Sequence, residues 1–256
     1  MKFGVCAKID QAPVVRQAGF DFIECTVVSL QAEQSDAEVR DLLAKFRESP
    51  VPAEAFNVML PGDLKIVGEQ VDAERIRRYL DKALERVKRA GGETVVFGSG
   101  KARMVPDHFE RERAEEQIIR FLEWTADVAD PLDITITIEP LNRSECNIIN
   151  SVPEADRFAR LLNRKSICVL ADFYHMCRDG EAYEGVVEHR ELLRHVHVAS
   201  AGRFAPAAGE DEFDAFAANV RKAKYDGRLS IECSWNRFED EAAAALSYLR
   251  TVFPQI

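Results

Sequence analysis

Eight short strand signals alternate with helical signals along the sequence, and this alternation limits the fold more than any other feature. Each strand signal is a short run of apolar and β-branched residues, followed by residues at helical spacing or by a helical turn. The expected strands are residues 3–6, 22–25, 53–58, 94–97, 134–138, 167–171, 195–198 and 229–231. Eight such units in 256 residues are typical of an α/β protein of the (β/α)8 TIM-barrel class, so we expect a single domain spanning residues 1–256. A doubly wound sheet is the alternative, but no Gly-x-Gly-x-x-Gly motif follows the first expected strand.

Helical spacing of apolar residues predicts the segments between these strands. Two of them begin with a capping box, a Ser followed three residues later by a Glu, at residues 35–38 and 151–154. The glycine-containing residues 98–101 follow the fourth strand, and we expect a plain turn there rather than a phosphate-binding loop. The expected helices are residues 12–19, 35–46, 73–90, 109–128, 151–162, 183–193, 212–224 and 239–252.

The fifth expected strand ends in an acid. Ile and Thr alternate over residues 134–138, which favours a strand, and Glu139 follows directly before a proline that stops further strand pairing. A buried carboxylate needs a cation or strong hydrogen-bond donors. The pattern recurs, because the sixth strand ends in Asp172, the seventh contains His197, and the eighth ends in Glu232. Since the C-terminal ends of all barrel strands meet at one mouth, we expect these four side chains to lie together.

Three carboxylates and one imidazole form a ligand set suited to one divalent ion. Oxygen-rich sites favour Mn²⁺ or Mg²⁺, with Co²⁺ or Zn²⁺ as alternatives. Taken singly, an acid at a strand end is more often a loop cap or an ion-pair partner, and only the recurrence at four strand ends indicates a metal site. His195, two residues before His197, is expected to pack or to form an ion pair rather than bind metal. Glu24, near the end of the second strand, is expected to be an acid behind the ligands or at the barrel mouth.

Composition and charge exclude several classes of function. Asp and Glu number 44 against 34 Lys and Arg, and the net charge of −10 argues against binding to nucleic acid or to anionic lipid. No apolar run reaches the ~18 residues of a membrane span, and we see no signal peptide at the N-terminus. The six cysteines form no Cys-x-x-Cys pair. We therefore expect a cytoplasmic protein with reduced thiols and no membrane partner.

Four motifs mark the last four expected strands. They are Ile138-Glu139-Pro140-Leu141-Asn142-Arg143-Ser144-Glu145, Ala171-Asp172-Phe173-Tyr174-His175-Met176, His195-Val196-His197-Val198 and Tyr225-Asp226-Gly227-Arg228-Leu229-Ser230-Ile231-Glu232. Together they resemble the xylose-isomerase-like TIM barrels, and within these the ketose 3-epimerase branch (tagatose and psicose 3-epimerases) of the sugar isomerase/epimerase family. The resemblance is strongest over residues 134–235. One departure is residues 206–209, which are Pro-Ala-Ala-Gly where the family often has Pro-Gly-x-Gly.

The resemblance implies a metal-dependent ketose 3-epimerase or sugar isomerase. It implies one divalent metal ion held by Glu139, Asp172, His197 and Glu232. It also implies that Glu139 and Glu232 are the acid/base pair on opposite faces of the sugar. This chemistry is coherent, because removing a proton next to a ketose carbonyl gives an enediolate that a cation stabilises. A base on each face then lets the proton return on the other side, which inverts the carbon.

The same resemblance implies that Glu145, His175 and Arg203 contact the substrate. The expected partner is therefore a small-molecule sugar. An unphosphorylated sugar is favoured, because barrel phosphate sites usually use the loops after strands seven and eight, and residues 233–236 contain no glycine. The sequence leaves the oligomeric state open, homo-oligomers included.

Other readings of the same residues remain. A metal-dependent dehydratase of a keto-inositol or a shikimate-type acid would use the same metal and base but expel water. An aldose–ketose or hydroxypyruvate-type isomerase is a further alternative. Endonuclease IV shares the fold but needs a His-rich multi-zinc site and a basic groove, against which the five His residues and the net charge of −10 both argue. A non-enzymatic sugar-binding barrel would be expected to lack a ligand, and none of the four is missing.

Overall fold

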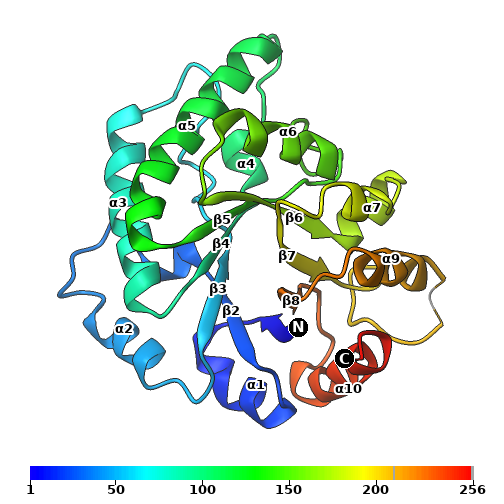
Figure 1. Cartoon of the computed structure of the whole chain (residues 1–256). Coiled ribbons are helices and arrows are strands. Elements are labelled where there is room, and N and C mark those ends of the chain that lie inside the picture. The colour runs from blue at the N-terminus through cyan, green and yellow to red at the C-terminus, as the bar shows by residue number, and fades with distance from the viewer. Residues whose placement is uncertain (210, 255–256) are drawn as a thin grey trace.

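Eight parallel strands close into a barrel in chain order, so the predicted (β/α)8 fold is confirmed. The computed structural model describes residues 1–209 and 211–254; residues 210, 255 and 256 of the predicted domain lie outside the described part. Figure 1 shows the strands at the centre with the helices around them. The strands are β1 (Lys2–Cys6), β2 (Phe22–Thr26), β3 (Ala53–Asn57), β4 (Thr94–Phe97), β5 (Thr135–Ile138), β6 (Ile167–Asp172), β7 (Leu193–Val198) and β8 (Arg228–Ile231).

The strands are connected mainly by α-helices that cover the outside of the barrel. They are α1 (Ala12–Ala18), α2 (Arg40–Arg47), α3 (Ala73–Arg89), α4 (Gly100–Arg103), α5 (Arg111–Leu132), α6 (Val152–Leu162), α7 (Phe173–Asp179), α8 (Gly185–Glu188), α9 (Asp211–Lys222) and α10 (Phe238–Val252). Two 3-10 helices, η1 (Ile9–Gln11) and η2 (Val27–Leu30), follow β1 and β2. No helix in residues 1–209 and 211–254 combines the length and apolarity needed to span a lipid bilayer.

The segment after β6 differs from the sequence-based prediction. A helix over residues 183–193 is wrong, because only the short α8 forms there, while the unpredicted α7 begins directly after β6. The carboxylate of Asp172 accepts the backbone N–H of His175 at 3.0 Å and so caps α7. Gly180 ends the helix with φ 64°, a left-handed conformation that glycine adopts readily. One aspartate thus ends a strand and starts a helix.

The segment after β2 also differs, because the helix predicted over residues 35–46 begins only with α2. The capping-box contacts of residues 35–38 form, but they close a turn. Arg86 of α3 is fully buried, and its guanidinium donates to the Gln34 carbonyl at 2.6 Å and to the Asp36 carboxylate at 3.0 Å. These hydrogen bonds hold the segment against α3 in a non-helical path.

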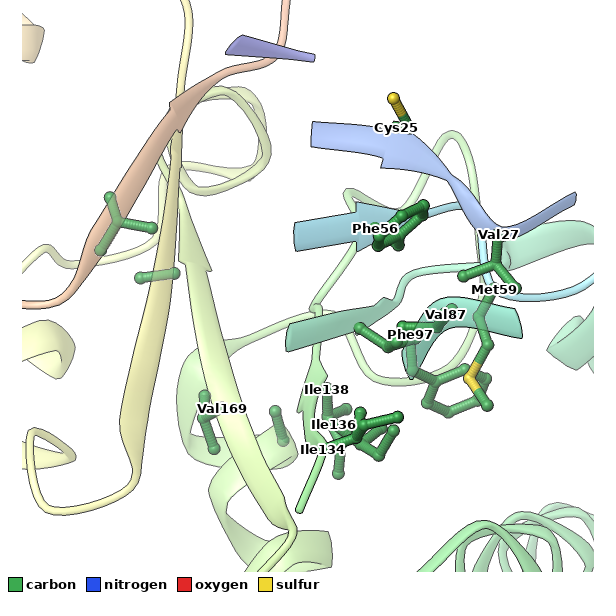
Figure 2. Packing of buried hydrophobic residues seen from close by; sticks show 14 of the residues in the cluster. Cys25, Val27, Phe56, Met59, Val87, Phe97, Ile134, Ile136, Ile138 and Val169 are labelled. Atoms are coloured by element: carbon green, nitrogen blue, oxygen red, sulfur yellow. The ribbon is translucent and has the colours of Figure 1, made fainter. Parts of the chain in front are cut away.

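Side chains alternate along each strand between the helical layer and the barrel interior. On β5, Ile136 and Ile138 pack in the hydrophobic cluster that lies between strands and helices. Figure 2 shows both residues together with Phe97 of β4 and Val87 of α3. Because successive residues of a strand point to opposite faces, Glu139 directly after β5 points into the mouth of the barrel. The strand pattern therefore positions the acid that the sequence singled out.

Candidate metal centre and active site

The ends of β5, β6, β7 and β8 bring the four predicted metal ligands together. His197 Nδ1 lies 3.2 Å from Glu139 Oε1, 3.8 Å from Asp172 Oδ2 and 3.8 Å from Glu232 Oε2. One ligand atom of each side chain lies within 4.8 Å of those of the other three. The strand register explains the geometry, because Asp172 pairs with His197 and Glu232 follows the last paired residue of β8. Residues far apart in sequence thus form one cluster.

The cluster concentrates negative charge in a buried place. Burial raises the pKa of Glu232 to about 7, and the charges of Glu139 and Asp172 add to this effect against His197. The pKa of Asp172 is also raised, first by burial and then by the charge of Glu139. Burial opposes the ionisation of Glu139 as well, but the hydrogen bond and charge of His197 outweigh it and lower the pKa of Glu139. Three carboxylates therefore share a buried space with the imidazole of His197, and Arg203 is a further cation beside Glu232.

This donor set fits a divalent cation. Carboxylate oxygens and an imidazole nitrogen are ligands that Mg²⁺, Mn²⁺, Co²⁺ and Zn²⁺ accept in proteins. A cation among the four side chains would offset the burial and the carboxylate repulsion that raise the pKa values of Asp172 and Glu232. The residues present are therefore able to hold the metal ion that the sequence predicts.

Behind this cluster, one carboxylate holds two imidazoles. Glu24 Oε1 lies 2.9 Å from His197 Nε2, and Glu24 Oε2 lies 2.8 Å from His195 Nε2. All three side chains are fully buried. His195 is expected from the sequence to pack or to form an ion pair rather than bind metal, and in the structure it is buried and contacts the Glu24 carboxylate, while burial lowers the pKa of its ring. A carboxylate on the far nitrogen of a histidine fixes the ring orientation and leaves the other nitrogen for a metal.

Arg203 connects the acids at the front of the site. Its Nη1 donates to Glu145 Oε1 at 2.8 Å, and its Nη2 donates to Glu232 Oε2 at 3.3 Å. The guanidinium carbon lies 4.6 Å from the centre of the Tyr174 ring, which adds a cation–π contact. A planar cation held on three sides keeps both carboxylates oriented in the mouth.

His175 presents an unused donor. The Asn142 backbone N–H donates to His175 Nδ1 at 3.1 Å, and Asn142 Nδ2 lies 2.8 Å from the same nitrogen. Two donors on Nδ1 place the proton of the neutral ring on Nε2, an assignment made from the hydrogen-bond network. His175 is 3% exposed, and its Nε2 has no hydrogen-bond partner among the described residues. Because buried donors are normally hydrogen-bonded, this N–H indicates a position where a ligand would accept a hydrogen bond.

A hollow of about 230 Å³ opens over these groups, and we call it the reaction hollow. Its polar lining residues include all three predicted substrate contacts and both predicted acid/base residues: Glu139, Glu145, His175, Arg203 and Glu232. The other two predicted metal ligands, Asp172 and His197, are buried beneath it. The geometry gathers every candidate site residue at one mouth of the barrel.

Two neighbours of the acids were not singled out from the sequence. Asn57, the last residue of β3, donates to Glu232 Oε1 at 2.7 Å. Gly98 follows β4, and a Cβ built on it would lie 2.0 Å from Glu139 Oε2, so only glycine leaves room for that carboxylate. Both residues sit at strand ends, and that position was the signal that could have indicated them.

Comparisons with known proteins give relatives in sequence and in fold. A sequence model of the family described as "Xylose isomerase-like TIM barrel" matches residues 13–252. The chain is 25% identical over 249 residues to a 3-dehydro-D-guloside 4-epimerase of Escherichia coli (strain K12), covering 93% of this chain and 92% of that protein. It is 23% identical over 225 residues to a D-psicose 3-epimerase of Agrobacterium fabrum, covering 85% and 76% respectively. A crystal structure of a D-psicose 3-epimerase in the presence of D-fructose superposes with a TM-score of 0.84 at 19% identity over 100% of both chains.

Proposed function

The chain belongs to the xylose isomerase-like TIM barrel family, and from this premise we propose that it is an isomerase, a divalent-metal-dependent ketose 3-epimerase. The observation that supports this most is the pair of carboxylates, Glu139 and Glu232, which approach one imidazole nitrogen from β5 and β8 at 3.2 Å and 3.8 Å. The two strands are not neighbours in the barrel. Each acid can therefore face a different side of a sugar held in the reaction hollow.

The metal ion would be held by Glu139, Asp172, His197 through Nδ1, and Glu232. When bound, a divalent ion stabilises the negative charge that develops on a sugar oxygen as a proton leaves the neighbouring carbon. The oxygen-rich donor set favours Mn²⁺ or Mg²⁺, and Co²⁺ or Zn²⁺ are the alternatives.

The acid/base chemistry falls to the two glutamates. The carboxylate of one removes the proton from the carbon next to the carbonyl, which leaves an enediolate on the sugar. The carboxylic acid of the other returns a proton to the opposite face of the same carbon, so that its configuration inverts. General acid–base assistance of this kind contributes about 10²–10⁴-fold.

The remaining groups orient the sugar. Among the described residues, His175 Nε2–H has no hydrogen-bond partner, and because His175 lines the reaction hollow this N–H can donate to a sugar oxygen. Arg203 offers the charge nearest to Glu232, and Glu145 accepts hydrogen bonds both from Arg203 at 2.8 Å and from Asn142 at 3.0 Å. An aligned substrate reacts faster because positioning lowers the entropic cost of the proton transfer.

A second candidate reaction is epimerisation at C4 of a 3-keto sugar. The relative named 3-dehydro-D-guloside 4-epimerase favours it, since that protein matches over 92% of its length. The chemistry is the same, because C4 of a 3-keto sugar is also next to a carbonyl carbon. The two glutamates would keep their roles, and only the position of the sugar in the reaction hollow would differ.

The proposal includes a cytoplasmic location and an unphosphorylated sugar. No disulfide links the cysteines of the described residues, which agrees with a reducing compartment. The loop after β8, residues 233–236, has no glycine with which to approach a phosphate closely.

Proton exchange with solvent tests the reaction. The Mn²⁺-loaded protein is incubated in D₂O with a panel of free ketoses, 3-keto sugars and keto acids, and the products are followed by NMR. We expect deuterium at C3 of a ketose, with inversion. Deuterium and inversion at C4 of a 3-keto sugar would select the second candidate. Loss of water would overturn the epimerase in favour of the dehydratase, and an aldose product would favour the aldose–ketose isomerase.

A further inference from the structure

A second and larger hollow lies beside the reaction hollow at the same mouth of the barrel. It occupies about 610 Å³ between residues 58–72, which follow β3, and residues 98–110, which follow β4. We call it the outer hollow, and six of its lining residues define it: Lys65, Val67, Gly68, Lys101, Met104 and Phe109. The proposed reaction uses none of them.

Lys101 connects the two hollows. It lines both, whereas Gly62 lines only the reaction hollow and Met104 lines only the outer hollow. A Cβ built on Gly62 would lie 3.4 Å from Cδ of Lys101, so the methylene stem of the lysine lies against this glycine. The ammonium group of Lys101 forms no ion pair with a carboxylate of the described part of the chain, and the side chain is exposed. Lys101, a cation with no carboxylate partner among the described residues, therefore lies at the boundary of the two spaces, which we call the ridge.

Contacts within the chain build the outer hollow in advance. The Ile66 N–H donates to the Ala102 carbonyl at 3.0 Å and joins the two segments. Lys65 Nζ donates to the Lys101 carbonyl at 2.8 Å, again across the segments. Gly68 has φ 106°, and a Cβ there would lie 3.0 Å from a proline side chain, so the close approach requires glycine. Because these contacts already order the surface, little conformational entropy would be lost when a ligand binds to it.

The lining suits a ring with an apolar face and a polar edge. Met104 is 40% exposed although it is apolar, and the half-buried Phe109 adds further apolar surface. Lys101 supplies donors at the ridge. The reaction hollow, at about 230 Å³, is smaller than the ~300–1,000 Å³ typical of small-molecule sites, whereas the outer hollow lies within that range. The reaction hollow therefore suits one sugar unit, and the outer hollow has room for a further ring.

We propose that the outer hollow is a subsite for a second ring attached to the reacting sugar, so that the natural substrate is a keto sugar in glycosidic linkage to another sugar or to an aryl group. This inference rests on the proposed epimerase function. The reacting unit occupies the reaction hollow, the linkage crosses the ridge at Lys101, and the second ring covers Met104 and Phe109.

The test compares matched substrates that differ only by the second ring. One pair is methyl and 4-nitrophenyl 3-keto-β-D-glucoside, and the other is D-fructose and its 6-O-glucosyl disaccharide. In the pair that is turned over, we expect the substrate with the second ring to have a kcat/KM at least about tenfold higher than its partner. This is the scale of the free energy gained when a ring is buried away from water. Met104→Trp, which places a bulky ring where the second ring would lie, should abolish this preference. The matched control is Leu161→Trp on α6, which replaces another apolar residue, 60% exposed and outside both hollows, and should keep the preference.

Two results would overturn the subsite: equal kcat/KM values within the pairs, or a preference that survives Met104→Trp in a variant whose circular dichroism is unchanged. Turnover of the small members alone would refute the subsite while leaving the epimerase proposal standing. If no substrate is turned over, the epimerase proposal fails, and binding decides the subsite by itself. Calorimetry would then compare 4-nitrophenyl with methyl β-D-glucoside. Tighter binding of the aryl glycoside, lost in Met104→Trp, supports the subsite, and equal binding refutes it.

Discussion

Glu24 and His197 form a fully buried hydrogen bond of 2.9 Å between Oε1 and Nε2, on the side of the imidazole away from the carboxylate cluster. The other oxygen of Glu24 holds His195 at 2.8 Å. With Nε2 bound to Glu24, Nδ1 is the nitrogen that faces Glu139, Asp172 and Glu232 and that a cation would bind in the neutral ring. The orientation of the proposed metal ligand is thus set from β2, on the far side of the ring.

Glu24→Gln should weaken metal binding by about 10–100-fold, which is the usual effect of removing the hydrogen-bond partner of a histidine ligand. The amide cannot accept hydrogen bonds from both imidazoles, so one ring loses its orientation. Calorimetric titration of the metal-free protein with Mn²⁺ measures the effect. Glu54→Gln is a matched control, because Glu54 is also a buried acid but pairs with Lys2 and Arg228 instead. Equal Mn²⁺ affinity in wild type and Glu24→Gln would refute the supporting role.

Glu139→Gln and Glu232→Gln should each retain metal and lose turnover. Glutamine keeps an oxygen ligand but can neither remove nor return a proton, so kcat should fall by about 10²–10⁴-fold. Metal content is measured by elemental analysis and turnover by NMR. If only one of the two variants loses activity, a single-base isomerase or a lyase becomes the better assignment.

Gly98→Ala should displace the Glu139 carboxylate, because the new methyl group would start 2.0 Å from Oε2. We expect Mn²⁺ affinity to fall about tenfold or more, and overpacking to lower the free energy of unfolding by about 1–3 kcal/mol. Gly185→Ala is the control, since a Cβ there meets nothing closer than 3.9 Å. Wild-type affinity in Gly98→Ala would show that Glu139 can move without consequence.

Arg203→Ala should raise KM, lower kcat, or both, while metal content stays unchanged. The guanidinium contacts Glu145 and Glu232 from the reaction hollow and is not itself a metal ligand. Steady-state kinetics and elemental analysis on the same preparation separate the two effects. Loss of the metal would instead make Arg203 a support of the metal centre.

The Glu181→Gln variant should become more stable relative to wild type as pH rises. Burial raises the pKa of Glu181 from 4.5 to about 7, with a further contribution from the charge of Asp179. A carboxyl whose pKa is higher in the folded state favours folding while it is protonated, and this contribution is lost as pH rises from about 4.5 through 7. Glutamine keeps an acceptor for the Val152 N–H, which binds Glu181 Oε1 at 2.8 Å. Urea unfolding at pH 5 and pH 8 measures the difference, and a difference independent of pH would contradict the raised pKa.

The sequence by itself determined the barrel and which four side chains form the proposed metal site. Alternation along residues 134–138 requires that Glu139 face the interior if the isoleucines face the helices. Barrel closure then brings all strand ends to one mouth, so Asp172, His197 and Glu232 could be grouped without coordinates. Short-range patterns predicted the helices less well. The helix α7, which Asp172 caps, was not indicated by any apolar periodicity.

Only the tertiary structure decided which atoms meet. Gly98 matters because its missing Cβ leaves space for a side chain that follows the neighbouring strand. Glu24 holds two histidines from which it is separated by 171 and 173 positions, and no local pattern encodes such a contact. The outer hollow likewise depends on how two loops pack against each other. Periodicity and propensity act over a few residues and fix which way a side chain points, whereas distances between side chains follow from strand register and loop packing across the closed barrel.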